Sequence, residues 1–164
     1  MSLMSGPNTR QPLYTAAQRE RRDATKWTLV QGVLAPIQFV VFLISLTLVL
    51  RYLWTGEGYG AANASIVLKT AILYSIMITG AIWEKVVFDQ YLLAPAFFWE
   101  DMVSFAVIFL HSLYLYSLFT GMMEPESLMW LAIAAYFIYV VNAAQFLRKL
   151  RSARLDTIPE VQHV

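Results

Sequence analysis

The chain has no cysteine among its 164 residues, so it forms no disulfide and holds neither an iron–sulfur cluster nor a cysteine-bound zinc ion. Histidine is also scarce, because His111 is accompanied only by His163 in the C-terminal tail. One chain therefore cannot hold a haem between two histidines inside a membrane. The phosphate-binding loop, the Gly-x-Ser-x-Gly motif and the Glu-x-x-His pair of di-iron proteins are missing as well.

Charged residues are also few: Asp, Glu, Lys and Arg make up 14% of the residues, and the net charge is +1. The basic residues form no stripe, and this argues against nucleic acid as a partner. Asp, Glu, Lys and Arg are absent from residues 27–50, 102–123 and 127–147. In residues 64–83, Lys69 is the single residue of these four types. A helix needs about 20 apolar residues to cross the hydrocarbon of a bilayer. The sequence therefore predicts an all-α integral membrane protein, a four-helix bundle in contact with lipid.

The distribution of Lys and Arg predicts the orientation of these spans. Ten of the 12 basic residues lie in the leader before residue 27, in the connection between spans 2 and 3, or in the tail after residue 147. The positive-inside rule then places both termini and the 84–101 connection in the cytoplasm. We expect a single domain at residues 27–150, a flexible basic leader at 1–26 and a cytoplasmic tail at 151–164. The first apolar run is too long for a cleaved signal peptide, and we expect it to be an uncleaved anchor.

Several connecting segments have distinctive compositions. Residues 1–12 are expected to be disordered, and residues 14–26 are expected to form a basic helix on the membrane surface. Pro36 indicates either that the first spanning helix begins near it or that the helix is kinked there. The 85–99 connection is rich in aromatic residues, so we expect it to lie in the membrane interface rather than in water.

Polar side chains from separate spans are predicted to converge at the cytoplasmic boundary. They are Glu84, Lys85, Glu100, Asp101, Asn142 and Gln145. Gln31 and Gln38 are seven positions apart, so they share one face of the first span. His111 is eleven positions after Glu100, so the two side chains point within about 20° of each other on a helix. His111 then lies about 16 Å deeper in the membrane than Glu100. This geometry predicts a slot with carboxyl groups at its mouth and an imidazole near mid-membrane.

Simpler interpretations exist for each of these residues. Glu100 and Asp101 are at a helix N-terminus, where anions are stabilised, and Glu84 with Lys85 is a possible interfacial ion pair. Asn142 and Gln145 are typical of hydrogen bonds between membrane helices. Lys69 is expected to extend its ammonium group to water at the outer end of its span.

His111 is the polar residue that these interpretations explain least well. An imidazole at mid-membrane should face the protein interior and have a partner. The chemistry alone leaves ligand or catalytic work and a structural hydrogen bond as equal alternatives.

Two blocks of the sequence are distinctive, Trp83-Glu84-Lys85 and the run that ends in Trp99-Glu100-Asp101. They resemble a known family, the 2-vinyl bacteriochlorophyllide hydratases of anoxygenic phototrophic bacteria. The similarity extends over about residues 13–150 and includes residues 13–15, 21–23, 27–36, 82–88, 94–101 and 141–146. The resemblance implies a multi-pass protein of the bacterial inner membrane, either cytoplasmic or intracytoplasmic. It also implies an enzyme that adds water to the vinyl group of a chlorophyllide in bacteriochlorophyll synthesis and needs no redox cofactor.

Hydration of an alkene must begin with an acid, because the vinyl group is a poor electrophile. We expect Glu100 or Glu84 to protonate the terminal vinyl carbon, since burial in an apolar site favours a neutral carboxyl group. Asp101 or the other glutamate would orient the water and take its proton.

The flat macrocycle would lie among aromatic side chains such as Trp83 and Trp99, with its propionate near Lys85 and the basic tail. Asn142, Gln145 and Gln38 would position water or the carbonyl groups of the ring. His111 is a possible axial ligand to the magnesium of the substrate, for which a water molecule is an alternative. The partners would be the chlorophyllide and lipid, with a homo-oligomer or other pigment-synthesis enzymes as further possibilities.

Two other classes of function fit part of this pattern. A pigment-binding subunit or carrier without catalysis would also use His111 and the aromatic residues. The carboxyl and amide groups gathered at the cytoplasmic boundary favour the hydratase, because binding of a pigment needs only one ligand to it. A small transporter is disfavoured because no internal repeat and no mid-membrane Asp or Glu is found.

Overall fold

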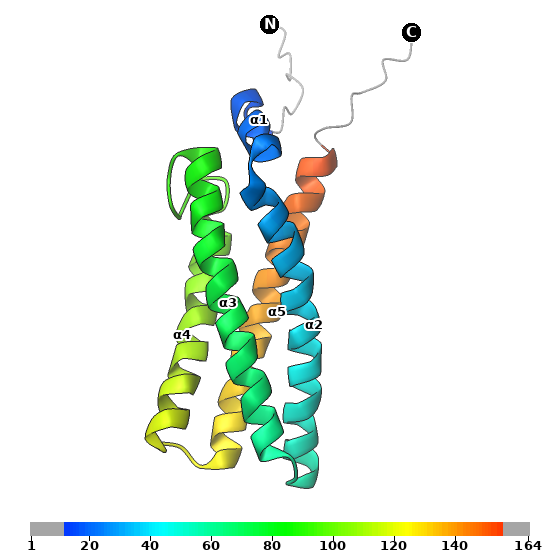
Figure 1. Ribbon diagram of the computed structural model, residues 1–164, viewed down its shortest axis with the longest axis vertical. Helices are drawn as coiled ribbons and strands as arrows, with labels where there is room; N and C mark the ends of the chain where they lie inside the picture. The colour runs from blue at the N-terminus through cyan, green and yellow to red at the C-terminus, as the bar shows by residue number, and fades with distance from the viewer. Residues whose placement is uncertain (1–11, 156–164) are drawn as a thin grey trace, which may run out of the picture.

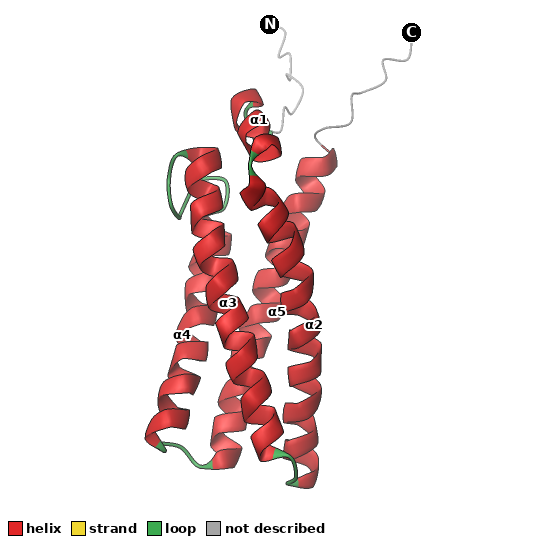
Figure 2. Cartoon of the chain, in the orientation of Figure 1, coloured by secondary structure: helices red, strands yellow, loops and turns green. Residues whose placement is uncertain are grey.

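A computed structural model describes residues 12–155, which form five α-helices and no strand (Figure 2). The helices are α1 (Ala16–Ala24), α2 (Lys26–Thr55), α3 (Tyr59–Phe88), α4 (Phe98–Thr120) and α5 (Pro125–Leu155). All but α1 are long and apolar enough to cross a membrane. The all-helical class and the four apolar helices predicted from the sequence are thus confirmed. The disorder expected for residues 1–12 lies mainly outside the described residues, as does His163.

The helix ends follow local sequence signals. Thr15 and Gln18 form a reciprocal capping box at the start of α1. Gly56 and Gly121 end α2 and α4 in the left-handed conformation that glycine adopts without strain. Pro125 begins α5, where its missing N–H costs nothing. These signals set the short turns that join α2 to α3 and α4 to α5.

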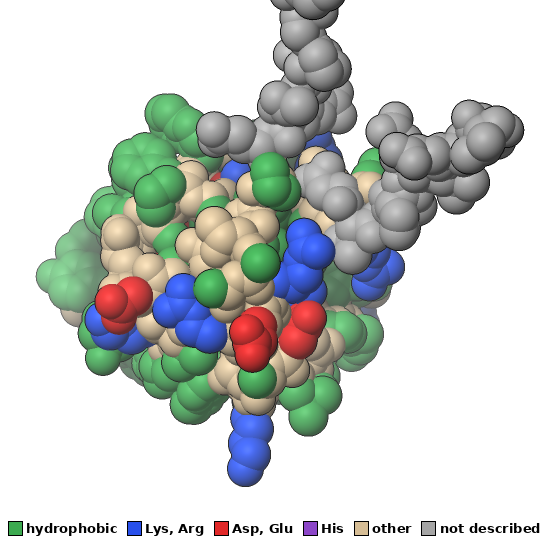
Figure 3. All heavy atoms as spheres, turned by 90° about the horizontal axis from the view of Figure 1, so that it is seen from above, with side chains coloured by type: hydrophobic (Ala, Val, Ile, Leu, Met, Phe, Trp, Pro, Cys, Tyr) green, Lys and Arg blue, Asp and Glu red, His purple; other side chains and the backbone are tan. Residues whose placement is uncertain are grey.

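Two antiparallel helix pairs make up the transmembrane part. Helix α2 packs mainly on α3 and α4 mainly on α5, while α2 contacts α5 and α3 contacts α4 less extensively (Figure 1). The start of α1, the α3–α4 connection and the end of α5 lie at one end of the molecule, at the top of Figure 1. Charged side chains gather on that end face, whereas hydrophobic side chains surround it (Figure 3). Large side chains such as Phe109, Phe119 and Phe137 are exposed, as expected for helices in contact with lipid.

The structure settles the alternative posed by Pro36. Helix α2 begins ten residues earlier, at Lys26, and continues through Pro36 to Thr55, so the helix does not start at the proline. The helices also extend further than the apolar runs. Thirty residues measure about 45 Å along a helix, so α2 and α3 reach well beyond a hydrocarbon layer of about 30 Å.

The leader is attached to the α3–α4 connection through aromatic contacts. The buried ring of Tyr14 lies 5.8 Å from the ring of Phe88 and 6.4 Å from that of Phe97, and Arg22 covers it at 4.8 Å. Burial raises the pKa of the Tyr14 hydroxyl, and the nearby Arg22 opposes this effect. The leader therefore covers one side of the connection that carries the candidate site.

Candidate functional site

Three carboxyl groups meet where α3 ends and α4 begins, and we name Glu84, Glu100 and Asp101 the carboxyl cluster. Each side chain is almost completely buried. Glu84 is in the last turns of α3, whereas Glu100 and Asp101 are in the first turn of α4. The connection reverses the chain between them, and this brings the two helix ends together as the sequence predicted.

Glu84 and Asp101 hold the connecting loop in place. Leu93 donates its backbone N–H to Asp101 Oδ2 at 2.7 Å, and Ala94 donates to Glu84 Oε2 at 3.3 Å. Leu93 has a φ of 59°, which is unusual for a residue with a side chain. The two carboxyl groups therefore bind adjacent N–H groups of one short turn, and this places them beside each other.

Glu100 connects α4 to α5. Its carbonyl oxygen accepts from Ser104 Oγ and from Asn142 Nδ2, each at 2.8 Å. Its carboxylate oxygen Oε2 lies 3.2 Å from Lys149 Nζ, which is an ion pair without hydrogen-bond geometry. Lys149 also donates to the carbonyl of Ala96 at 2.5 Å. The predicted interhelical role of Asn142 is therefore present, and it fixes the backbone of Glu100.

A polar pocket of about 310 Å³ opens beside Glu100. It is lined by Glu100, Gln145, Arg148, Lys149 and Ser152. Glu100 Oε2 and Gln145 Oε1 are both buried, and neither accepts a hydrogen bond from any of the described residues. Buried acceptors without a donor are costly, and such a site favours a ligand that donates hydrogen bonds.

A second pocket, of about 390 Å³, lies between the leader and the loop, and we name it the leader pocket. It is lined by five apolar residues and two polar ones, namely Pro12, Leu13, Phe88, Pro95 and Ala96 together with Gln18 and Lys149. Lys149 lines both pockets, so they are neighbours. Sequence analysis used the basic tail to predict orientation and placed the propionate near it, but it did not name Lys149 as a site residue. The signal that was available is the spacing of Asn142, Gln145 and Lys149, which places all three on one face of a helix.

The middle of the helices contains an unexpected buried lysine side chain. Lys69 is completely buried, with Nζ 3.2 Å from His111 Nε2 and 4.0 Å from the centre of the Tyr139 ring. The expectation that Lys69 reaches water was wrong. His111 Nδ1 lies 2.8 Å from the carbonyl of Val107, so both nitrogens of this buried imidazole are engaged. We refer to Lys69 and His111 as the mid-span pair.

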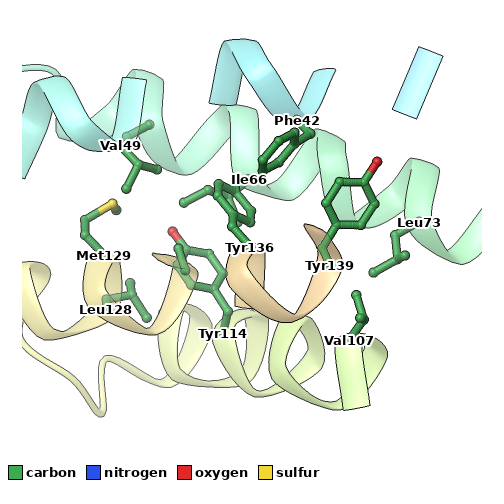
Figure 4. Close-up of a cluster of buried hydrophobic side chains, with 12 residues drawn as sticks. Phe42, Val49, Ile66, Leu73, Val107, Tyr114, Leu128, Met129, Tyr136 and Tyr139 are labelled. Carbon is green, nitrogen blue, oxygen red and sulfur yellow. The ribbon is translucent and has the colours of Figure 1, made fainter. Parts of the chain in front are cut away.

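The predicted slot between the carboxyl groups and His111 is filled by side chains. Val107 lies on the same face of α4 and is 1% exposed, and Tyr139 and Leu73 pack around it (Figure 4). Neither His111 nor Lys69 lines either of the two pockets described above. Buried side chains thus occupy the region between the carboxyl cluster and His111.

The remaining predicted residues lie outside the polar pocket. Gln38 is buried, and neither atom of its amide has a partner among the described residues. Trp83 donates to Thr28 Oγ1 at 2.9 Å, whereas the side chain of Trp99 is 70% exposed. Lys85 pairs with Asp89 at 2.8 Å. Within residues 12–155, no group of three or more histidine or acidic side chains is arranged to bind a metal ion.

Comparison with known proteins adds independent information. Residues 14–152 match the family described as 2-vinyl bacteriochlorophyllide hydratase. A protein of this name from Cereibacter sphaeroides is 70% identical over 145 residues, which cover 88% of this chain and 89% of the relative. Another from Rhodobacter capsulatus is 62% identical over 153 residues, covering 93% and 88% respectively. No solved structure matches the chain.

Proposed function

The chain belongs to the 2-vinyl bacteriochlorophyllide hydratase family, and from this premise we propose that it is a hydro-lyase acting through the polar pocket beside Glu100. The reaction adds water across the vinyl group of a chlorophyllide and gives a hydroxyethyl group, as a step of bacteriochlorophyll synthesis. The observation that supports this location is that two buried oxygens, Glu100 Oε2 and Gln145 Oε1, accept no hydrogen bond from the described residues.

A water molecule suits these two oxygens because it has two O–H groups to donate. The pocket is polar and has room for more than one water. Held between a carboxylate and an amide oxygen, the water presents its own lone pair to a ligand in the pocket. Glu100 can then accept a proton when the water attacks, and this assigns it the role of general base.

The acid is best provided by Glu84 and Asp101. Within residues 12–155, Lys149 is the one cation at ion-pair distance from the carboxyl cluster, and it lies against Glu100. Two further buried negative charges would have no counter-ion, which is costly. A proton shared by Glu84 and Asp101, which bind adjacent N–H groups of one turn, removes one of these charges. We assign this proton to the terminal vinyl carbon of the substrate.

Each step balances. Proton transfer from the pair forms the C–H bond and leaves a cation on the carbon next to the macrocycle, which delocalises the charge. The bound water forms the C–O bond, and Glu100 takes one of its protons. Returning that proton to Glu84 and Asp101 restores the enzyme, so the net change is the addition of one water.

The apolar macrocycle fits the leader pocket better than the closed middle of the helices. Leu13, Phe88, Pro95 and Ala96 provide apolar walls there. Arg148 in the polar pocket is available to the propionate, with Lys85 at the same end of the molecule. Leu93 and Ala94 donate to the acid pair, so this turn orients the two carboxyl groups.

We keep the other predicted substrate contacts in the proposal, although each of them needs a further condition. Trp99 is exposed and can stack on a flat ring that arrives from the lipid. Gln38 has an unused amide, and Trp83 would act through the aromatic cluster around Phe97. Magnesium ligation by His111 would require Lys69 to release Nε2.

The same proposal includes the placement in the membrane. The four long helices form a four-helix bundle in the bacterial inner membrane, with the leader at residues 1–26, the spans at 27–150 and the tail at 151–164. The end that carries α1, the loop and the end of α5 faces the cytoplasm, because the basic residues gather there. Contacts with further copies or with other pigment-synthesis enzymes would use the exposed apolar faces.

The test uses membranes that contain the full chain, with membranes lacking it as the control. Vinyl chlorophyllide is added, and the red absorption band and the product mass are followed in isotopically labelled water. We expect a blue shift and the incorporation of one labelled oxygen. Retained pigment without a new product would instead indicate a carrier and contradict the hydratase.

The carboxyl cluster is tested by Glu84→Gln, Glu100→Gln and Asp101→Asn, made separately. General acid–base groups contribute about 10²- to 10⁴-fold, so each change should lower kcat by at least about 100-fold in folded protein. Wild-type turnover in all three variants would remove the carboxyl mechanism.

A further inference from the structure

Lys149 lies between Glu100 and the α3–α4 loop. Its ammonium group lies 3.2 Å from Glu100 Oε2, donates to the Ala96 carbonyl at 2.5 Å and lies 5.7 Å from the centre of the Phe97 ring. The side chain is 27% exposed and lines both pockets. One cation thus connects α5 to α4 and to the α3–α4 loop.

The contact with Glu100 affects which carboxyl group of the cluster carries a charge. Three buried acids share one nearby cation, and the negative charge is most stable on the acid beside it. That acid is Glu100, so the proton remains with Glu84 and Asp101. Lys149 thereby separates the base from the acid in a cluster of chemically similar groups.

The contact with Ala96 has a second consequence. Ala96 is two residues after Ala94 and three after Leu93, whose N–H groups bond to Glu84 and Asp101. Holding the Ala96 carbonyl therefore fixes the turn that orients the acid pair. The same side chain thus contacts both Glu100 and the turn that orients Glu84 and Asp101.

We propose that Lys149 is a positioning residue for hydration, which holds Glu100 as the base and fixes the 93–96 turn over the acid pair. This inference depends on the function proposed above. It assigns to a basic residue of the C-terminal helix a role in catalysis beyond membrane orientation.

The experiment compares Lys149→Met, Lys149→Arg and the matched control Arg151→Met in full-length protein in membranes. Arg151 is exposed on the same helix end and lines neither pocket. A small displacement of catalytic groups can cost about 100-fold. We expect kcat to fall by about that factor in Lys149→Met, with KM changed less than about threefold, and to recover largely in Lys149→Arg. Arg151→Met should behave as wild type.

A double-mutant cycle tests whether Lys149 acts through Glu100. In a Glu100→Gln background, Lys149→Met should lower kcat much less than it does in wild type. Equal effects in both backgrounds, or wild-type kcat in Lys149→Met, would overturn the inference. If Lys149→Met does not fold, the same cycle with Lys149→Arg replaces it, and its small effect should likewise disappear. Failure of the wild type to hydrate would instead contradict the proposed function itself.

Discussion

The carboxyl cluster and the mid-span pair both bury polar side chains from different helices, yet they differ in what those side chains contact. Lys69 and His111 bond to each other, and aromatic rings surround the ammonium group. At the helix ends, Glu100 Oε2 forms an ion pair with Lys149, but neither this oxygen nor Gln145 Oε1 accepts a hydrogen bond from the described residues, and both side chains line a pocket. Burial of a polar group alone therefore does not indicate chemistry. A buried acceptor that lacks a hydrogen-bond donor and lies next to a pocket does indicate chemistry, because it can still bind a ligand that donates a hydrogen bond.

The largest effect on stability is expected from His111→Ala. It removes the bonds to Val107 and Lys69 and leaves a cavity, so the free energy of unfolding should fall by about 2–4 kcal/mol. The measurement is reversible unfolding in detergent. If the pair is structural, the ratio of KM values for magnesium-containing and magnesium-free substrate should stay as in wild type. A selective loss of affinity for the magnesium form would break the comparison and establish His111 as the axial ligand.

An intermediate effect is expected from Asn142→Leu, which removes both bonds from α5 to the start of α4. Hydrogen bonds between membrane helices contribute about 0.6 kcal/mol on average. The loss of stability should therefore be about 1 kcal/mol, with a moderate drop in kcat as Glu100 becomes less well held. Wild-type kcat in Asn142→Leu would show that the bond from Asn142 to the Glu100 carbonyl does not position Glu100.

The smallest effect is expected from Asp89→Asn at the end of α3. The exposed Lys85 hydrogen-bonds to Asp89 and lowers the pKa of its carboxyl group. The pair contributes to stability above the ordinary pKa of an aspartate, and the contribution is lost as the pH falls through the lowered pKa. Melting curves of wild type and variant should coincide at neutral pH within error, because exposed pairs contribute little. A clear loss of stability or activity at neutral pH would extend the functional site to Lys85.

Several features could be predicted from the sequence because they depend on composition along the chain. The four apolar helices follow from runs without charge, and the convergence of Glu84, Glu100 and Asp101 follows from their places at consecutive helix ends. Asn142 was expected to bond between helices, and it does so.

Other features depend on how each helix is rotated about its axis, which mean hydropathy does not report. Lys69 lies ten residues after the start of α3, and the sequence suggested a route to water, but the rotation of α3 points it toward Tyr139 and His111. Lys149 appeared to be one of several basic flanking residues, until the packing of α5 on α4 placed it against Glu100.

The sequence by itself determined that four helices are long and apolar enough to cross a membrane, which end of each helix carries charge, and which family the chain belongs to. The tertiary structure alone decided which polar groups are paired and which are left facing a pocket. The physical reason is that crossing a bilayer depends on the summed transfer free energy of a segment, whereas a site depends on contacts between side chains of different segments.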